Sequence, residues 1–198
     1  MIRKAIDRLI KRAVFCCSSI AVTLVISGCS NLPAPTDVNS SLIILSIEAE
    51  RALGTNRPDL VSILKKEDNS EISYTSKSGK YYYFANLPAG TYQIHLAAIQ
   101  TQLANSTSTS NNVTVSTKAT NINNFPFDQE IIDASTVNLE AKKVIFMGSV
   151  TAEGTSKYFP PGAIEISDVK ITRSDNETQA AYEAFKKENK DSGWIDRF

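Results

Sequence analysis

The sequence is poor in the residue types that most often carry chemistry. Its 198 residues include one histidine, His95, and three cysteines. A single histidine leaves no Ser-His-Asp or Cys-His arrangement except through His95 itself. Zinc sites take three or four Cys, His or carboxylate ligands, and only carboxylates remain to fill such a set. We therefore predict no catalytic residue, no metal site and no cofactor, and interpret His95 as a strand-surface or packed residue.

Glycine is also scarce, at eight residues, and the chain has neither a P-loop nor a dinucleotide-binding glycine motif. The acidic residues near 128–133 match no calcium-binding loop. A pair of carboxylates that the fold brings together remains one open route to glycan hydrolysis, because such a pair is assembled in space and not in sequence. We predict that the protein is not an enzyme, with this hydrolase as the least favoured alternative.

The N-terminal region combines positive charge with a short apolar run. Five basic residues and one acidic residue precede an apolar stretch over 13–26. This is the pattern of a secretory signal peptide. The stretch is shorter than the roughly 20 residues that span a bilayer as a helix. The pattern predicts a removable signal peptide over 1–28.

The apolar stretch ends in Ile26-Ser27-Gly28-Cys29, which resembles the lipobox of bacterial lipoproteins. The resemblance implies cleavage before Cys29 and a thioether link between its thiol and diacylglycerol, with palmitate or similar acyl chains. Cys16 and Cys17 lie inside the apolar stretch and would be removed. In this family an Asp after the cysteine commonly retains the protein in the inner membrane. Ser30 in that position implies a lipid-anchored outer-membrane protein, on the periplasmic or the surface face; an ordinary secreted protein is the alternative.

Removal of the signal peptide makes the protein acidic. The whole chain has 21 basic and 21 acidic residues, and the loss of five basic and one acidic residue leaves a net charge near −4. Nucleic acid is bound chiefly through Lys and Arg, so we predict no nucleic-acid partner. Cys29 is the only cysteine after residue 28, so the fold must depend on its hydrophobic core without an internal disulfide.

The mature chain divides into a short leader and one domain. Residues 29–41 contain two prolines and several small polar residues, and predict a lipidated N-terminus with a flexible tether. Residues 42–198 are enough for a single β-sandwich domain. Within it, 101–124 is dominated by Ser, Thr and Asn and predicts a mobile loop, in which 112–117 could pair as an edge strand.

Runs rich in β-branched and aromatic residues alternate with turn signals in the domain. They predict strands over 42–49, 60–66, 71–76, 81–87, 91–99, 135–141, 143–151 and 163–173. Strands at this spacing predict a mainly β protein, an antiparallel β-sandwich or barrel. The apolar alternation changes phase near Ser167-Asp168, which predicts a β-bulge.

The C-terminal region predicts one α-helix near 175–190. Ser174 and Glu177 have the spacing of a capping box at its start. Trp194 and Ile195 follow Gly193, and we expect them to fold back as a hydrophobic clasp.

The stretch Ser78–Ile94, with the letters SGKYYYFANLPAGTYQI, resembles the signature of transthyretin-like, or carboxypeptidase-regulatory-like, β-sandwich modules. The resemblance implies a hairpin that turns at Pro88 and Gly90. Tyr82 and Phe84 before the turn, and Tyr92, Ile94 and Leu96 after it, alternate as in half-buried strands. Modules of this kind serve many functions, so the resemblance concerns the fold.

These patterns together predict a membrane-anchored cell-envelope lipoprotein that acts as a non-enzymatic binding, accessory or structural module. The alternative is a secretion-system adaptor lipoprotein. The expected partners are membrane lipid, through acylated Cys29, and an envelope protein or glycan. Tyr81 and Tyr83 alternate with core-facing residues, so we predict that they form a partner surface together with the Ser/Thr/Asn-rich loop.

Overall fold

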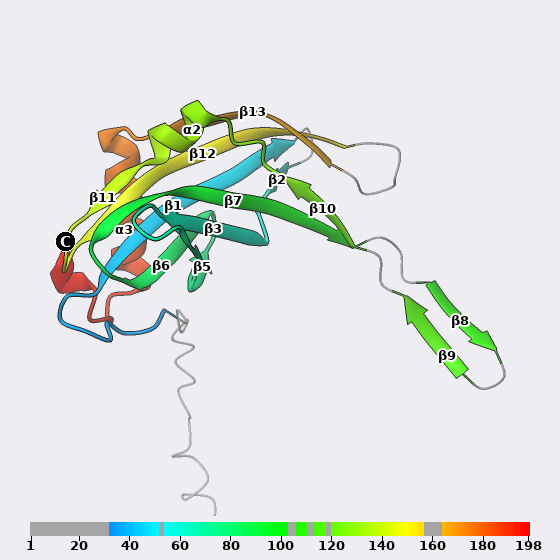
Figure 1. Ribbon diagram of the computed structural model, residues 1–198, viewed down its shortest axis with the longest axis horizontal. Helices are drawn as coiled ribbons and strands as arrows, with labels where there is room; N and C mark the ends of the chain where they lie inside the picture. The colour runs from blue at the N-terminus through cyan, green and yellow to red at the C-terminus, as the bar shows by residue number, and fades with distance from the viewer. Residues whose placement is uncertain (1–31, 52–53, 103–105, 111–112, 118–119, 157–163) are drawn as a thin grey trace, which may run out of the picture.

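The computed structural model describes residues 32–51, 54–102, 106–110, 113–117, 120–156 and 164–198. The predicted signal peptide and Cys29 lie outside these residues. Two β-sheets pack face to face, and one helix covers the outer face of one of them (Figure 1). The prediction of a mainly β protein with a β-sandwich is confirmed.

The first sheet, sheet A, has the strand order β13-β12-β1-β6-β5, and β2 pairs with β1. Its strands are β1 (Ser41–Arg51), β2 (Gly54–Asn56), β5 (Ser76–Ser78), β6 (Tyr81–Leu87), β12 (Val144–Ser156) and β13 (Ile164–Thr172). β1 and β12 run parallel, with Leu42 opposite Val144. This parallel pair departs from the predicted antiparallel sandwich, whereas the other strand pairs described are antiparallel. Parallel neighbours need a long crossover, and here the whole of the other sheet lies between β1 and β12 in the chain.

The second sheet, sheet B, has the order β10-β7-β3-β4, and β11 pairs with β7. Its strands are β3 (Leu60–Lys65), β4 (Ser70–Ser73), β7 (Gly90–Gln102), β10 (Thr120–Asn124) and β11 (Val137–Leu139). A separate hairpin of β8 (Ser106–Ser110) and β9 (Val113–Thr117), here called the arm, projects beyond the sandwich (Figure 1). The prediction of a mobile loop over 101–124 is wrong where β8 and β10 form, whereas the strand predicted as possible over 112–117 is present as β9. Threonine and valine suit strands, and β10 pairs with β7.

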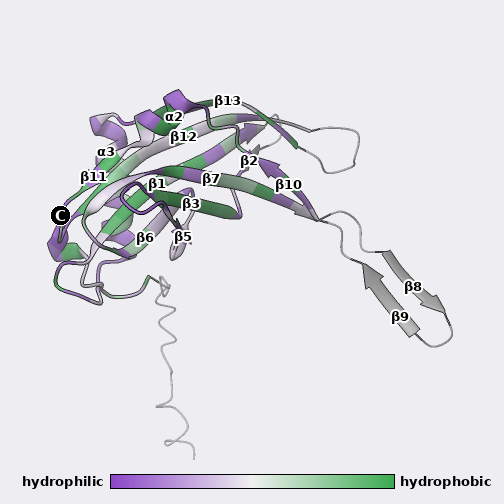
Figure 2. Cartoon of the chain, viewed as in Figure 1, coloured by the Kyte–Doolittle hydropathy of each residue, from purple (hydrophilic) through white to green (hydrophobic). Residues whose placement is uncertain are grey.

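Two hydrophobic clusters lie on the two faces of sheet A. Ile43 and Leu45 of β1 belong to the core between the sheets, whereas Leu42 and Ile44 face the C-terminal helix. A strand buried on both faces has a nearly continuous apolar sequence, which explains the run over 42–45. Figure 2 shows hydrophobic residues along the central strands and hydrophilic residues along much of β10 and the helices.

The C-terminal helix α3 (Asp175–Glu188) begins as predicted. The Ser174 hydroxyl accepts a hydrogen bond from the Glu177 backbone N–H at 3.2 Å, and the Glu177 carboxylate accepts one from the Ser174 N–H at 2.8 Å. Trp194 after the helix is fully buried, and the short 3₁₀ turn η2 (Ile195–Arg197) follows it. The predicted clasp is therefore present. Of the helices described, none has the length and apolar character needed to cross a membrane.

A second helix, α2 (Gln129–Ser135), was not predicted. Asp128 caps it by accepting a hydrogen bond from the Ile131 N–H at 2.9 Å. At its other end the Ser135 hydroxyl accepts a hydrogen bond from the Ile94 N–H of β7 at 2.9 Å. The helix thereby joins sheet B to the short strand β11.

Two of the register shifts between paired strands bear on the sequence predictions. In β13, Ser167 lies opposite Glu153 and Lys170 opposite Thr151, and Asp168 between them has a φ of 46°. The predicted bulge is confirmed. In β7 a second shift separates Ile94 from Leu96. Leu96 is therefore only half-buried, and the prediction that it continues the inward face of Ile94 is wrong.

The turn after β6 is a crossing between sheets. β6 belongs to sheet A and β7 to sheet B, so the predicted hairpin is wrong although both strands form. Asn86 has a φ of 62° and Gly90 a φ of 159°. Asparagine and glycine tolerate such backbone angles better than other residues. This crossing forms one wall of the candidate site.

Candidate functional site

A cleft of about 550 Å³ lies between the N-terminal segment and the β6–β7 crossing. Its lining residues are Thr36, Asp37, Asn39, Ser40, Asn86, Leu87, Pro88, Ala89 and Ala141. Most of these belong to two short segments, 36–40 and 86–89, which are fifty residues apart in sequence. The walls of the cleft therefore depend on the contacts that hold these segments together.

Asn86 provides the central contact between the two walls. Its side-chain oxygen accepts hydrogen bonds from the Thr36 N–H at 2.8 Å and from the Thr36 hydroxyl at 3.1 Å. Its side-chain amide donates to the Ala34 carbonyl at 3.2 Å. The positive φ of Asn86 is one that short amide side chains accommodate. One residue thus shapes the crossing and fixes the N-terminal segment against it.

The segment 37–40 forms a compact turn of its own. The Ser40 N–H donates to the Asp37 carbonyl at 3.1 Å, and the Asn39 N–H donates to the Asp37 carboxylate at 2.6 Å. The Ser40 hydroxyl accepts a hydrogen bond from the Asp37 N–H at 3.1 Å. Asp and Asn favour such turns because their side chains bond the backbone two residues on.

The C-terminus holds the other side of the N-terminal segment. The indole N–H of Trp194 donates to the Pro33 carbonyl at 2.8 Å. The Arg197 guanidinium donates to the Ser40 carbonyl, and to the Asp37 carbonyl at 3.2 Å. Leu32 is 9% exposed and belongs to the same cluster as Trp194. Residues 32–41 therefore pack against the domain, and the predicted flexible tether does not describe this segment.

Tyr92 holds the wall of the cleft that residues 86–89 form. Its hydroxyl donates a hydrogen bond to the Pro88 carbonyl at 2.8 Å. Burial, with a further contribution from the negative charge of Glu67, raises the pKa of Tyr92 to about 12. The phenol therefore stays protonated and remains a donor across the physiological pH range.

The cleft is lined by both hydrogen-bonding and apolar groups. Thr36, Asn39 and Asn86 offer hydroxyl and amide groups, and Asp37 offers one carboxylate, beside the apolar rings and methyl groups of Pro88 and Ala89. Asp37 already accepts a hydrogen bond within its own turn. Such a mixed wall can hydrogen-bond a neutral or weakly charged group while covering an apolar part of it.

The predicted partner surface at Tyr81 and Tyr83 is not supported. Tyr83 is 1% exposed, and its ring packs edge-on against Phe185 of α3 at a centroid distance of 5.3 Å. Tyr81 is half-buried against the same cluster. The prediction that Tyr83 is exposed is wrong because α3 covers the outer face of sheet A.

His95 is exposed on β7, as predicted for a strand-surface residue, and its Nε2 lies 3.8 Å from a Glu71 carboxylate oxygen.

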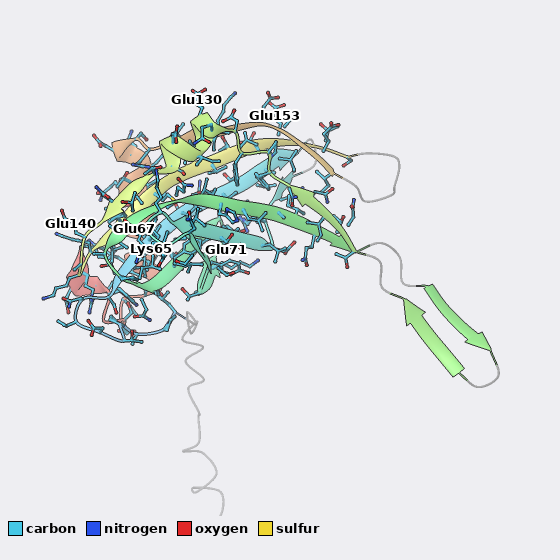
Figure 3. The ribbon with its side chains drawn as sticks, viewed as in Figure 1. Lys65, Glu67, Glu71, Glu130, Glu140 and Glu153 are labelled. Atoms are coloured by element: carbon cyan, nitrogen blue, oxygen red, sulfur yellow. The ribbon has the colours of Figure 1, made fainter. Side chains whose placement is uncertain are left out.

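The acidic residues are held by local hydrogen bonds. Hydrogen bonds from the Thr91 backbone lower the pKa of Glu67, and those from the Ser70 side chain and backbone lower the pKa of Asp68. Figure 3 shows Glu130 on α2, Glu153 on β12 and Glu71 on β4, well apart from one another. In the part of the chain that the structure describes, no three His, Cys, Asp or Glu residues are grouped so as to hold a metal ion.

Sequence reasoning missed the residues that build the cleft. The ANLPAG sequence over 85–90 contains a turn-forming asparagine two positions before Pro88 of the predicted turn, which could have drawn attention to Asn86. Nothing in the local sequence connects Trp194 or Arg197 with residues 33–40, because these contacts join the two ends of the domain.

Comparison with known proteins adds no relative: no family model matches the sequence, and neither the curated proteins nor the solved structures contain a match.

Proposed function

We propose that this chain is a cell-envelope lipoprotein, anchored in the outer membrane through acylated Cys29, and that its sandwich is a non-enzymatic binding or accessory module. The observation that carries the proposal is the position of Leu32. Leu32 is 9% exposed, belongs to the cluster that contains Trp194, and lies three positions after Cys29. Packing of a residue so close to the lipobox against the domain fits a mature chain whose first residue is Cys29.

The cleft and the arm are the two places where the proposed module meets its partner. The cleft offers hydrogen-bonding groups next to apolar ones, and the arm extends away from the sandwich. A transthyretin-like relationship of the sandwich is part of the proposal, and the 78–94 signature supports it. Stable capture of one protein would identify the module as an adaptor of a secretion machine.

Changing Cys29 to Ala tests the anchor directly. We expect the variant to lose incorporation of a fatty-acid probe and to leave the membrane fraction, because the thiol is the acyl acceptor. Cys17→Ala is the matched control, since Cys17 lies inside the signal peptide and should leave both properties unchanged. Membrane association and probe incorporation that persist in Cys29→Ala would refute the lipoprotein proposal.

The binding role is tested by a photo-crosslinking amino acid placed at Ala89, an exposed residue of the cleft wall. The same amino acid at Lys170, an exposed residue of β13 outside the cleft lining, is the control. We expect a discrete crosslinked product in cells from position 89 and none from position 170, with mass spectrometry to identify it. Equal amounts of crosslinked product from both positions would show that the cleft is not the contact site of the partner.

A further inference from the structure

The N-terminal segment leaves very little chain between the lipid and the fold. Leu32 is buried beside Trp194, and Pro33 is held by the indole N–H at 2.8 Å. Only Ser30 and Asn31 separate Leu32 from Cys29. Consecutive Cα atoms are 3.8 Å apart, so a fully extended link spans at most about 11 Å. An acylated Cys29 therefore brings the folded domain to the bilayer surface itself.

Three segments form a continuous surface around this attachment point. The Lys142 N–H donates to the Asn39 carbonyl at 3.4 Å, and the Arg197 guanidinium donates to the Asp37 carbonyl at 3.2 Å. A Cβ on Gly193 would lie 3.3 Å from the Pro35 ring. We call residues 35–40, 141–143 and 193–197 the anchor-end surface. In Figure 1 the N-terminal segment and the C-terminus lie at one end of the molecule, and the arm lies at the other.

Val38 is the most exposed large hydrophobic residue described, at 63%. It sits at the tip of the 37–40 turn, and it is not among the residues that line the cleft. Lys142 and Lys143 are exposed in the neighbouring turn. An apolar side chain flanked by lysines suits the boundary between lipid headgroups and acyl chains. Within the surface, the negative charges of Asp37 and Asp196 offset most of the positive charge of the two lysines and Arg197, so the surface has little net charge.

We propose that the anchor-end surface rests on the bilayer that holds the lipid of Cys29, with Val38 at the level of the headgroups. This inference rests on the proposed lipid anchor. It fixes the orientation of the domain: the cleft opens beside the bilayer, and the arm is presented to partners away from it. Because the surface is nearly neutral, its contact with the bilayer depends on the short link and on Val38, and high salt does not release it.

The test uses the acylated protein in vesicles of phosphatidylethanolamine and phosphatidylglycerol. The thiol of Cys29 is consumed by the lipid, so Val38→Cys carries the only reactive thiol and accepts a single environment-sensitive fluorophore. Ile122→Cys on β10, where the native side chain is 53% exposed, is the matched control. We expect headgroup-spin-labelled lipid to quench the fluorophore at position 38 severalfold more than at position 122, at low and at high salt. Equal quenching at the two positions would overturn the inference.

A second variant inserts a Gly/Ser linker of about 12 residues, with a root-mean-square length of about 20 Å, between Asn31 and Leu32. We expect this longer link to reduce quenching at position 38, and unchanged quenching would contradict the role of the short link. Fatty-acid labelling of the same preparations separates the two proposals. Labelled protein with equal quenching at 38 and 122 refutes the orientation alone, whereas absence of label refutes the lipoprotein proposal and this inference with it.

Discussion

Tyr83 joins sheet A to α3 through both its ring and its hydroxyl. The ring meets Phe185 edge-on, and the hydroxyl donates to the Glu188 carboxylate at 3.0 Å. Burial, reinforced by the nearby Glu188 charge, raises the pKa of Tyr83 far above its usual value, so the hydroxyl stays a donor. Strand alternation predicted the inward face of β6 correctly at Tyr82 and Phe84. It could not show that a helix a hundred residues later covers the opposite face.

Substitutions at Tyr83 should separate the contribution of its hydroxyl hydrogen bond to stability from that of its ring packing. We expect Tyr83→Phe to lower the free energy of unfolding by about 1 kcal/mol, because one hydrogen bond is lost. Tyr83→Ala should lower it by about 3–5 kcal/mol, because it also leaves a cavity beside Phe185. Urea unfolding followed through the fluorescence of Trp194, the single tryptophan, measures both. Tyr81→Ala is the control at a half-buried position and should cost less than Tyr83→Ala; an equal cost would argue against the packing described here.

At the scale of elements, two local sequence signals predicted structure correctly, whereas the pairing of strands far apart in the sequence was not predicted. The capping box at Ser174 and the phase change at Asp168 depend on neighbouring residues, and both were predicted correctly. The parallel pair of β1 and β12 depends on residues about a hundred positions apart, which periodicity cannot connect. Gly148 in β12 has a φ of 148°, and a Cβ there would lie 3.0 Å from the Thr172 carbonyl oxygen. The close approach of β13 to β12 thus depends on this glycine, although no local pattern marked it.

The polar strand β10 was not predicted, for a related reason. β10 has the sequence TNINN, and most of its side chains are not buried. Backbone pairing with β7 therefore holds this strand in the sheet more than burial of side chains does. Asn123 also uses its side chain, whose oxygen accepts a hydrogen bond from the Ile164 N–H of β13 at 3.2 Å. This contact closes one edge of the sandwich between the two sheets. A rule that assigns strands by apolar alternation does not detect a strand held in this way.

On the scale of the whole molecule, the two ends differ in construction. One end combines the N-terminal segment, the cleft and the C-terminal clasp, and its contacts join residues up to 161 positions apart. The other end carries the arm, whose strands pair with one another as a separate two-stranded sheet. Sequence reasoning predicted the sandwich and placed a partner contact in the Ser/Thr/Asn-rich region. It did not predict the cleft, because the cleft exists only where the chain ends meet the β6–β7 crossing.

This division predicts that the arm can be removed without unfolding the sandwich. Gln102 of β7 lies opposite Thr120 of β10, so an Asn-Gly turn in place of residues 103–119 can close the two strands as a hairpin. Within the described residues, β8 and β9 form a two-stranded sheet of their own and contribute no strand to sheet A or sheet B. We therefore expect the free energy of unfolding to change by less than about 1 kcal/mol, since shortening a loop alters its closure entropy only slowly.

The same variant decides whether the arm contacts the partner. If it does, the shortened protein keeps its urea midpoint and its membrane association but no longer captures what the full-length protein captures by in-cell crosslinking. The control replaces residues 103–119 by a Gly/Ser segment of equal length. It shows whether capture depends on the amino-acid sequence of the arm or only on its length. Unchanged capture by both variants would assign partner binding to the cleft end, and a loss of several kcal/mol of stability would show that the arm belongs to the folded core.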